Sequence, residues 1–335
     1  MIELKRKNVL ITGAGGFIGS HLTERLIEIG CRVRAFVRYN SRGDIGALRY
    51  ISKKKLKKVD VVLSDLRDYN VMEDALKGIN IVFHLGALIA IPYSYIYPRQ
   101  VMETNIMGTL NILMACRKNK RLEKVIHTST SEVYGTALYV PIDEKHPFQA
   151  QSPYSASKIG ADKIAESFFD SYNLPITIIR PFNTYGPRQS LRAIIPTIIS
   201  QALIKNNIEA GSLTPRRDFT YVQDTVEAFI KIAESEKCMG KTVNIGSNYD
   251  ISIKQLIQKI SKIMGKEIKT IQKKERVRPE FSEVQRLRAD NSLASKLIGW
   301  KPTVSIEDGL EETISWFSDN IEQIKARQNI EEYVI

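Results

Sequence analysis

Two residues that could act together as a base, Tyr154 and Lys158, stand four positions apart directly after Pro153. A helix that opens at this proline would place both side chains on one face. A free tyrosine ionises at about pH 10, and a neighbouring ammonium lowers that pKa. The spacing therefore predicts a phenolate base near neutral pH, although a tyrosine and a lysine at this spacing also occur together by chance.

Three polar residues, Thr130, Ser131 and Glu132, follow the strand-like run Lys124 to Thr128. Residues at the carboxyl ends of parallel strands face the ligand crevice in open α/β sheets. A threonine there could hydrogen-bond the hydroxyl that a phenolate deprotonates. Glu132 adds a carboxylate that simple hydride transfer does not need, but that removal of a carbon-bound proton requires. The alternative for Glu132 is a surface or helix-capping residue.

Three glycines spaced three apart, Gly13, Gly16 and Gly19, lie between the strand-like segment Asn8 to Thr12 and the helical stretch Phe17 to Ile29. Glycines here permit a tight turn, close approach of the backbone to a pyrophosphate, and close packing of helix on strand. The amino terminus of the helix adds free N–H groups and a partial positive charge. The pattern differs by one residue from the GxGxxG fingerprint and predicts a dinucleotide site.

The second strand-like run ends at Arg38, without the carboxylate that reads a free 2′-hydroxyl on the adenosine ribose. Arg38 is placed to pair with a 2′-phosphate, and its alternative is a solvated loop arginine. NADP is therefore the preferred cofactor, with NAD as the second choice. Asp65 ends the run Val61 to Ser64 and could hydrogen-bond the adenine amino group or cap a helix.

Short β-branched runs alternate with helical patterns in the first half of the chain, which implies a parallel sheet covered on both faces. The expected strands are Asn8 to Thr12, Arg32 to Val37, Val59 to Ser64, Ile81 to Leu85, Lys124 to Thr128 and Ile176 to Ile179. The expected helices are Phe17 to Ile29, Val71 to Leu76, Thr104 to Arg117, Ile194 to Ile204, Gln223 to Glu234, Ser252 to Met264 and Ile306 to Phe317. We predict an α/β fold, a Rossmann-type doubly wound parallel sheet with a smaller α/β substrate-binding lobe. The dinucleotide-binding domain would span 1–180, with returning segments near 215–250, and 181–335 would form mainly the substrate lobe.

Composition narrows the classes of partner. The chain has 335 residues, 43% hydrophobic content and a net charge of +12, which favours anionic ligands such as nucleotides. The lysine run at 53–58 lacks interleaved aromatics and is expected to be a solvated surface, with no nucleic acid bound. Three scattered cysteines predict neither a disulfide framework nor a zinc site, and His84, His127 and His146 lack metal-ligand spacing. No signal peptide or membrane span is expected, which predicts a cytoplasmic protein.

Taken together, the motifs resemble those of extended short-chain dehydrogenase/reductases that act on nucleotide-sugars. They include the glycine turn, the Thr130-Ser131-Glu132 triplet before Val-Tyr-Gly, YxxxK, the run 180–187, the run 217–222 and Arg278-Pro279, and the resemblance covers about residues 5 to 320. The triplet is similar to that of 4,6-dehydratases, in the form of the GDP-mannose branch. The stretches 88–95 and 131–145 look closest to legionaminic-acid-pathway dehydratases, which act on a GDP- or UDP-linked N-acetylglucosamine.

The resemblance implies roles for individual residues. Thr130, Ser131, Glu132, Tyr154 and Lys158 would be catalytic. The dinucleotide would contact Gly13, Gly16, Phe17, Ile18, Gly19, Arg38, Asp65, Leu66, Leu85, Ala87, Tyr154 and Lys158, the last at the nicotinamide ribose. The nucleotide-sugar would contact Ser94, Asn183, Arg217 and Arg278, because the planar fork of arginine suits phosphate oxygens. No metal is expected, and relatives of this class commonly form homodimers.

The implied reaction is a redox-neutral lyase reaction that yields a 4-keto-6-deoxy sugar. Tyr154 would take the C4 hydroxyl proton while hydride leaves C4 for the nicotinamide. Glu132 would remove the C5 proton, the C6 hydroxyl would leave as water with a proton from Glu132 or through Ser131, and hydride would return to C6. A nucleotide-sugar 4-epimerase, which needs no C5 base, is the first alternative. A non-catalytic dinucleotide sensor is the second.

Overall fold

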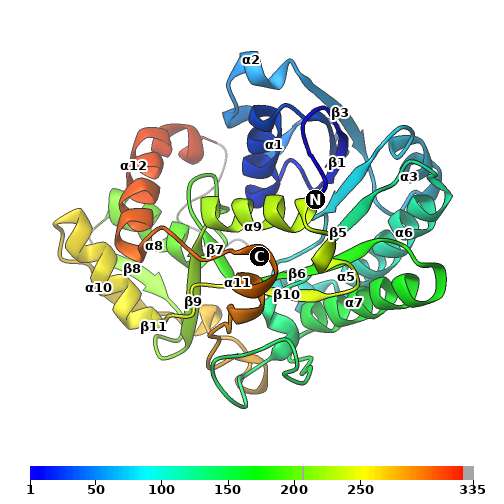
Figure 1. Ribbon diagram of the computed structural model, residues 1–335. Helices are drawn as coiled ribbons and strands as arrows, with labels where there is room; N and C mark the ends of the chain where they lie inside the picture. Colours follow the sequence, from blue (N-terminus) through cyan, green and yellow to red (C-terminus); the bar gives the residue numbers. More distant parts are fainter. Residues whose placement is uncertain (206, 327–335) are drawn as a thin grey trace.

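Seven parallel strands form the main sheet of the protein, in the order β10-β6-β5-β4-β1-β2-β3 (Figure 1). The computed structural model describes residues 1–205 and 207–326. The strands are β1 (Asn8–Thr12), β2 (Arg32–Arg38), β3 (Val59–Ser64), β4 (Ile81–His84), β5 (Lys124–Thr128), β6 (Ile176–Pro181) and β10 (Thr242–Ile245). The predicted parallel sheet is confirmed, since every neighbouring pair within it runs parallel.

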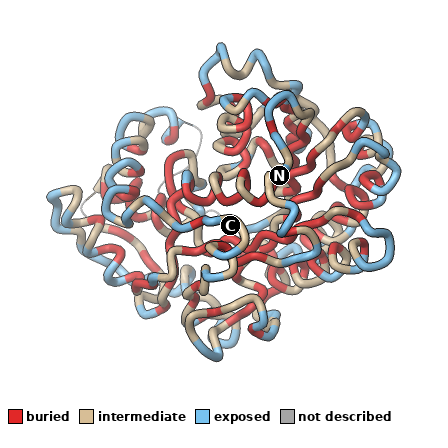
Figure 2. Tube along the Cα trace, in the orientation of Figure 1, coloured by how far each residue is buried: buried red, intermediate tan, exposed pale blue. Residues whose placement is uncertain are grey.

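Helices cover both faces of this sheet. On one face, α1 (Phe17–Ile29) and α9 (Val222–Glu234) pack with Val9 and Ile11 of β1. On the other face, α3 (Tyr69–Ala75), α6 (Gly108–Lys118) and α7 (Pro153–Tyr172) form a second apolar layer that includes Leu10. Successive strand residues point to opposite faces, so both faces need apolar cover. Figure 2 shows the result as a buried sheet with exposed outer helix faces.

The remaining helical turns of the first half lie in the connections. They are the 3₁₀ helix Gly46–Tyr50, α2 (Lys53–Leu56), α4 (Ile91–Ile96), α5 (Pro98–Met102), a π-helical segment (Glu103–Met107) and the 3₁₀ helix Ser131–Tyr134. The lysine run forms α2, where Lys55 pairs with Glu24 and Glu28 of α1. The single helix predicted from Thr104 to Arg117 is therefore an unbroken helical succession of α5, the π segment and α6.

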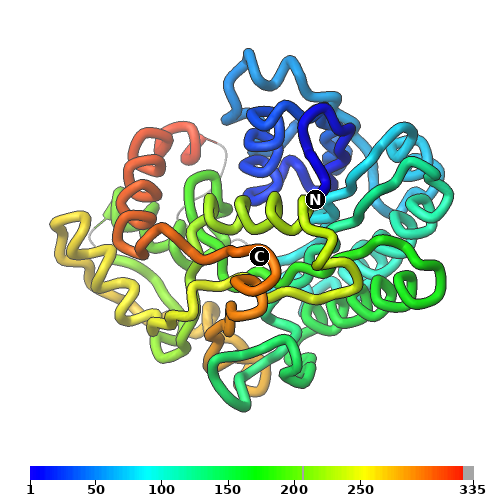
Figure 3. Tube along the Cα trace, viewed as in Figure 1, coloured from blue at the N-terminus to red at the C-terminus, as the bar shows by residue number. Residues whose placement is uncertain are grey.

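A smaller lobe is built from two short sheets and three longer helices. Its strands are β7 (Asn183–Tyr185), β8 (Asn207–Ala210), β9 (Arg216–Tyr221), β11 (Asp250–Ser252) and β12 (Lys269–Gln272), paired as β11-β9-β7 and β12-β8. Its longer helices are α8 (Ile194–Ile204), α10 (Ile253–Met264) and α12 (Ile306–Lys325), with short 3₁₀ turns at Lys274–Arg276 and Glu280–Ser282. The shorter α11 (Ser292–Ile298) contacts β10 of the main sheet and the 3₁₀ turn Glu236–Cys238. The yellow α10 and the red α12 lie side by side in Figure 3.

The two lobes share one apolar core, which runs from β1 and α1 through α9 to α8, α10 and α12. Both β10 and α9 belong to the main sheet layer although they come late in the chain. The division at residue 180 stays a prediction.

Each of the three cysteines is buried and unpaired. Within the described part of the chain, no helix has both the length and the apolar character that a bilayer crossing requires.

Candidate active site

The glycine turn joins β1 to α1 and leaves no room for side chains. Gly13 has φ +71°, and a methyl group on it would lie 2.8 Å from the backbone nitrogen of Gly86. A methyl group on Gly19 would collide with the carbonyl oxygen of Gly13. Gly16 is the N-cap of α1 without any side-chain cap, so the amides of Phe17 and Ile18 have no carbonyl partner inside the helix. This tight cradle of backbone N–H groups fits a pyrophosphate.

The end of β2 lies beside this turn, because the backbone N–H of Gly13 donates to the carbonyl oxygen of Phe36 at 3.1 Å, and Arg38 pairs in register with Ser64 of β3. The side chain of Arg67 donates to both carboxylate oxygens of Asp65, at 3.0 and 2.7 Å. These hydrogen bonds hold the pKa of Asp65 below its usual value. The helix-capping alternative for Asp65 is wrong, because Asp68 is the N-cap of α3. Its contact with adenine stays a prediction.

Three apolar residues follow the glycine turn along the carboxyl ends of the strands. Leu66 lies under the turn after β4, where a methyl group on Gly86 would meet its Cδ1 at 2.8 Å. The backbone N–H of Leu85 donates to the carbonyl oxygen of Thr12 at 3.2 Å, and Ala87 is half-buried two residues later. The predicted residues Leu66, Leu85 and Ala87 therefore lie on the same edge of the sheet as the glycine turn.

Asn105, which the sequence analysis did not identify, fixes the loop after β4 by its hydrogen bonds. Its side chain accepts from the N–H of Leu88 at 2.8 Å and donates to the Leu88 carbonyl at 2.9 Å. It also donates to Ser157 Oγ on α7 at 2.9 Å. Asn105 lies in the π-helical segment, and such segments often occur at functional sites. This asparagine joins the loop after β4 to the helix that carries Tyr154.

Tyr154, Thr130 and Glu132 come together at the carboxyl end of β5. Thr130 is the N-cap of the 3₁₀ helix Ser131–Tyr134, and its hydroxyl accepts from the N–H of Glu132 at 3.2 Å. The Thr130 hydroxyl also hydrogen-bonds the phenol of Tyr154, and the charge of Glu132 acts on that phenol. Ser131 is buried beside them, whereas Glu132 is half-buried. The structure thus assembles the predicted phenol, hydroxyl and carboxylate.

The predicted lowering of the Tyr154 pKa is wrong for the structure as it stands. Burial raises the pKa of Tyr154, and the hydrogen bond with Thr130 only partly opposes this rise. The ammonium of Lys158 donates to the carbonyl oxygen of Thr128 at 2.6 Å, and the groups that act on the pKa of Tyr154 are Thr130, Glu132 and Asp162 rather than Lys158. A phenolate near neutral pH therefore needs added positive charge beside Tyr154.

Two of the predicted substrate residues, Arg217 and Arg278, lie around one carboxylate, that of Glu283. Arg217 donates to Glu283 Oε1 at 3.2 Å, and Arg278 Nη1 lies 3.8 Å from the same oxygen. Arg217 is buried, which lowers its pKa, while the charge of Glu132 raises it. Two guanidinium groups held together in this way suit a diphosphate. Glu132 is thus within electrostatic reach of both Tyr154 and Arg217.

The other two predicted substrate residues are placed differently. Ser94 is fully buried in α4, and its hydroxyl donates to the carbonyl of Ile91 at 2.7 Å. Asn183 at the start of β7 is half-buried, and its side chain reaches the Asp218 carbonyl at 3.5 Å. Asn183 therefore pairs in register with Phe219, two residues after Arg217 on β9, whereas a contact of Ser94 with substrate would require its hydroxyl to turn.

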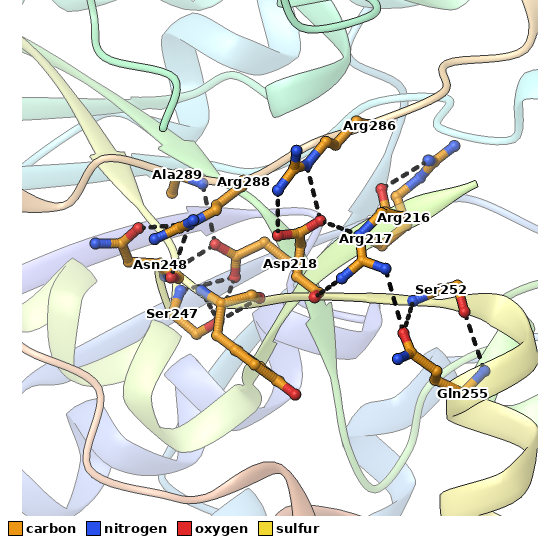
Figure 4. Close-up of polar contacts among 12 residues, drawn as sticks. Arg216, Arg217, Asp218, Ser247, Asn248, Ser252, Gln255, Arg286, Arg288 and Ala289 are labelled. Carbon is orange, nitrogen blue, oxygen red and sulfur yellow. Dashed lines mark hydrogen bonds and ion pairs between the residues drawn. The ribbon is translucent and has the colours of Figure 1, made fainter. Parts of the chain in front are cut away.

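A frame of polar contacts holds Arg217 in place (Figure 4). Asp218 accepts from the backbone N–H groups of Ser247, Asn248 and Ala289 at 2.7 to 3.0 Å, and burial raises its pKa to about 6. Asp250 accepts from Arg286 at 3.0 and 3.1 Å. These contacts tie the chain around residue 286, just after Glu283, to β9 and β11.

The sequence profile of the GDP-mannose 4,6 dehydratase family matches residues 10–313. The chain belongs to this family. UDP-N-acetyl-alpha-D-glucosaminuronate decarboxylase of Bacillus cytotoxicus is 34% identical over 325 residues, covering 94% of this chain and 98% of that protein. dTDP-D-glucose 4,6-dehydratase of Homo sapiens is 30% identical over 333 residues, covering 95% of this chain and 92% of that protein. Among solved structures, a UDP-glucuronic acid 4-epimerase variant from Bacillus cereus matches with a TM-score of 0.85 at 29% identity, covering 93% of this chain and 99% of that chain. It was solved with UDP-4-deoxy-4-fluoro-glucuronic acid and NAD.

Membership in the GDP-mannose 4,6 dehydratase family makes the chain an enzyme of the short-chain dehydrogenase/reductase class that modifies nucleotide-sugars. The resemblance inferred from the motifs is confirmed at this level. Relatives of similar identity are named as dehydratases, decarboxylases and epimerases, so family membership is compatible with each of these reactions.

The three histidines discussed above all make polar contacts within the fold. His84 lies between the hydroxyls of Thr12 and Thr109, at 2.7 and 3.0 Å, and His127 contacts Asp162 at 3.1 Å. His146 accepts from the N–H of Leu138 at 3.0 Å. Over residues 1–205 and 207–326, no cluster of three potential metal ligands occurs.

Proposed function

We propose that this protein is a nucleotide-sugar 4,6-dehydratase that converts a GDP- or UDP-linked N-acetylglucosamine to its 4-keto-6-deoxy derivative. The observation that carries the proposal is the position of Glu132. Its carboxylate lies within electrostatic reach of both the buried phenol of Tyr154 and the guanidinium of Arg217. A hexose whose diphosphate is held by Arg217 would therefore lie between a phenol and a carboxylate.

The dinucleotide supplies a hydride acceptor and returns the hydride at the end of the cycle. Tyr154, hydrogen-bonded to Thr130, takes the proton of the C4 hydroxyl. The resulting 4-keto group acidifies the C5 hydrogen, which Glu132 removes. The C6 hydroxyl leaves as water, with its proton supplied by Glu132 or through the buried Ser131. Reduction of the resulting C5–C6 double bond places the hydride on C6 and a proton drawn from solvent on C5. Arg217 and Arg278 hold the diphosphate, so the sugar carbons stay aligned with these groups.

A nucleotide-sugar 4-epimerase is the second candidate, because an epimerase of 29% identity shares the fold over 93% of the chain. Epimerisation uses a phenol base and the dinucleotide but no C5 base. The half-buried carboxylate of Glu132, next to Thr130, favours dehydration over epimerisation. The N-acetylglucosamine substrate rests on the likeness of stretches 88–95 and 131–145 to legionaminic-acid-pathway dehydratases.

The decisive experiment incubates the purified chain with a panel of GDP-, UDP- and dTDP-linked hexoses, with no reductant added. We expect mass spectrometry to detect the loss of one water from a GDP- or UDP-linked N-acetylglucosamine. In deuterated solvent, deuterium should appear at C5 of that product. Isomerisation at C4 without water loss would instead support the epimerase, and turnover of dTDP-glucose alone would refute the assigned substrate.

We further propose that NADP is the preferred dinucleotide, although the Bacillus cereus relative was solved with NAD. Replacing Arg38 with alanine should weaken NADP binding by about 10- to 100-fold, the value of one charged hydrogen-bond pair, and change NAD binding little. Arg32, at the opposite end of β2 and also exposed, is the matched control. Calorimetric titration of both variants with both dinucleotides measures this. Equal loss for NAD and NADP would show that Arg38 does not read the 2′-phosphate.

The homodimer and the cytoplasmic location stay predictions.

A further inference from the structure

Asp162 continues the row formed by Tyr154 and Lys158. The three residues stand four positions apart on α7, which places their side chains on one face of the helix. The Asp162 side chain is fully buried. A buried carboxylate is costly unless it is well partnered, so its partners indicate its purpose.

Four hydrogen bonds reach this carboxylate from two strands. Ser129 Oγ donates at 2.6 Å, and His127 Nε2 lies at 3.1 Å, both at the end of β5. Arg180 of β6 donates through Nε at 3.2 Å and Nη2 at 2.9 Å. Although burial raises it, these partners hold the pKa of Asp162 down at about 2, so the group is a carboxylate at neutral pH.

The placement of these partners bears directly on Lys158. His127 and Ser129 flank Thr128, whose carbonyl oxygen accepts from Lys158 Nζ at 2.6 Å. Asp162 therefore fastens α7 to β5 on both sides of the atom that holds the lysine. A slip of α7 along β5 would break the bonds to Asp162 and the bond from Lys158 together.

We propose that Asp162 is a positioning residue, which keeps the side chain of Lys158 against the Thr128 carbonyl and keeps it charged. The relevance of Lys158 to catalysis rests on the proposed function. The attachment of α7 to β5 through Asp162 rests only on the contacts of that carboxylate.

The charged and titratable groups around Lys158 support this assignment. Burial lowers the pKa of Lys158 to about 8, and the charge of Asp162 opposes that change. His84 on β4 and His127 on β5 also face the lysine, but burial lowers their pKa values and leaves them neutral. Arg180 lies on the far side of Asp162. Asp162 is thus the carboxylate whose charge opposes the effect of burial on the pKa of Lys158.

The test is a direct titration of Lys158 in the protein without substrate, by NMR of lysine carrying ¹³C at Cε. The variant Lys158→Arg identifies the signal. In Asp162→Asn, which keeps the shape but removes the charge, the pKa of Lys158 should fall by about one unit or more. A Lys158 pKa within about 0.3 unit of the unaltered value would overturn the proposal.

Ser129→Ala is the matched control, because it removes the 2.6 Å hydrogen bond to Asp162 while every charge remains. Its Lys158 pKa should shift by less than half as much. An equal shift in Ser129→Ala would attribute the effect to packing and overturn the role of the charge. Loss of one partner from a buried ion pair can destabilise a fold, so a second variant is needed. Asp162→Ser leaves room for a water molecule in place of the carboxylate. The pKa of Lys158 should fall in this variant as it does in Asp162→Asn.

A kinetic measurement separates this inference from the proposed function. Asp162→Asn should lower kcat for the nucleotide-sugar by about 10-fold or more at neutral pH, with KM changed by less than about 3-fold. If the unaltered chain turns over no nucleotide-sugar, the proposed function fails, and the Lys158 titration still decides the role of Asp162.

Discussion

Replacing Glu132 with glutamine is expected to slow water loss from the nucleotide-sugar by about 10³-fold, within the range that loss of a general base produces. Glutamine keeps the size of the side chain but cannot take a proton from C5. Oxidation at C4 depends on Tyr154 and should continue, so the sugar is expected to stop at its 4-keto form. The reduced dinucleotide should then accumulate and be visible by its absorbance in a single turnover.

Glu144→Gln is the matched control for this variant. Glu144 is also a half-buried glutamate, and it accepts from the backbone N–H of Asn244 at 2.8 Å, away from Tyr154. Its rate of water loss should stay within about 3-fold of the unaltered rate. Mass spectrometry of the product and stopped-flow absorbance give both readouts. Undiminished water loss in Glu132→Gln would refute the base assignment, and an epimerase would keep most of its activity in that variant.

Local signals explain why some elements could be read from the sequence. The helix Phe17–Ile29 begins and ends where predicted, because Gly16 is its N-cap and Gly30 adopts the left-handed conformation after its last turn. The helix predicted to end at Phe317 continues to Lys325, since Ile324 is still buried against the core. The π-helical segment at Asn105 was not predicted, because the contacts of Asn105 there are with Leu88 and Ser157 of other elements.

The difference between local signals and contacts between distant residues also applies to the site. Tyr154 and Lys158 could be identified because their spacing lies within one helix turn, and Glu132 because it follows a strand end. Glu283 could not be identified, because its partner Arg217 lies 66 positions away and only the folded chain brings them together. The predicted lowering of the Tyr154 pKa was wrong for a related reason. The spacing of residues along a helix shows which side chains are neighbours, but it does not show how deeply they are buried.

Replacing Tyr154 with phenylalanine should lower turnover by about 10³-fold, because it removes the phenol and nothing else. The ring would stay in its buried place on α7, so dinucleotide binding should be little changed. Only the hydrogen bond with Thr130 is lost, and the free energy of unfolding should change by about 1 kcal/mol. Steady-state kinetics, dinucleotide titration and denaturant unfolding measure these three quantities.

Tyr185→Phe is the control, since Tyr185 is equally buried and its hydroxyl donates to the Ile306 carbonyl at 3.3 Å, away from Thr130. Its turnover should stay within about 3-fold of the unaltered value. The pH profile adds a second criterion. Because the base works as a phenolate and burial raises the pKa of Tyr154, kcat of the unaltered chain should rise with pH on the acid side. The residual rate of Tyr154→Phe should lack that rise, and a variant that keeps both the rise and the rate would place the base elsewhere.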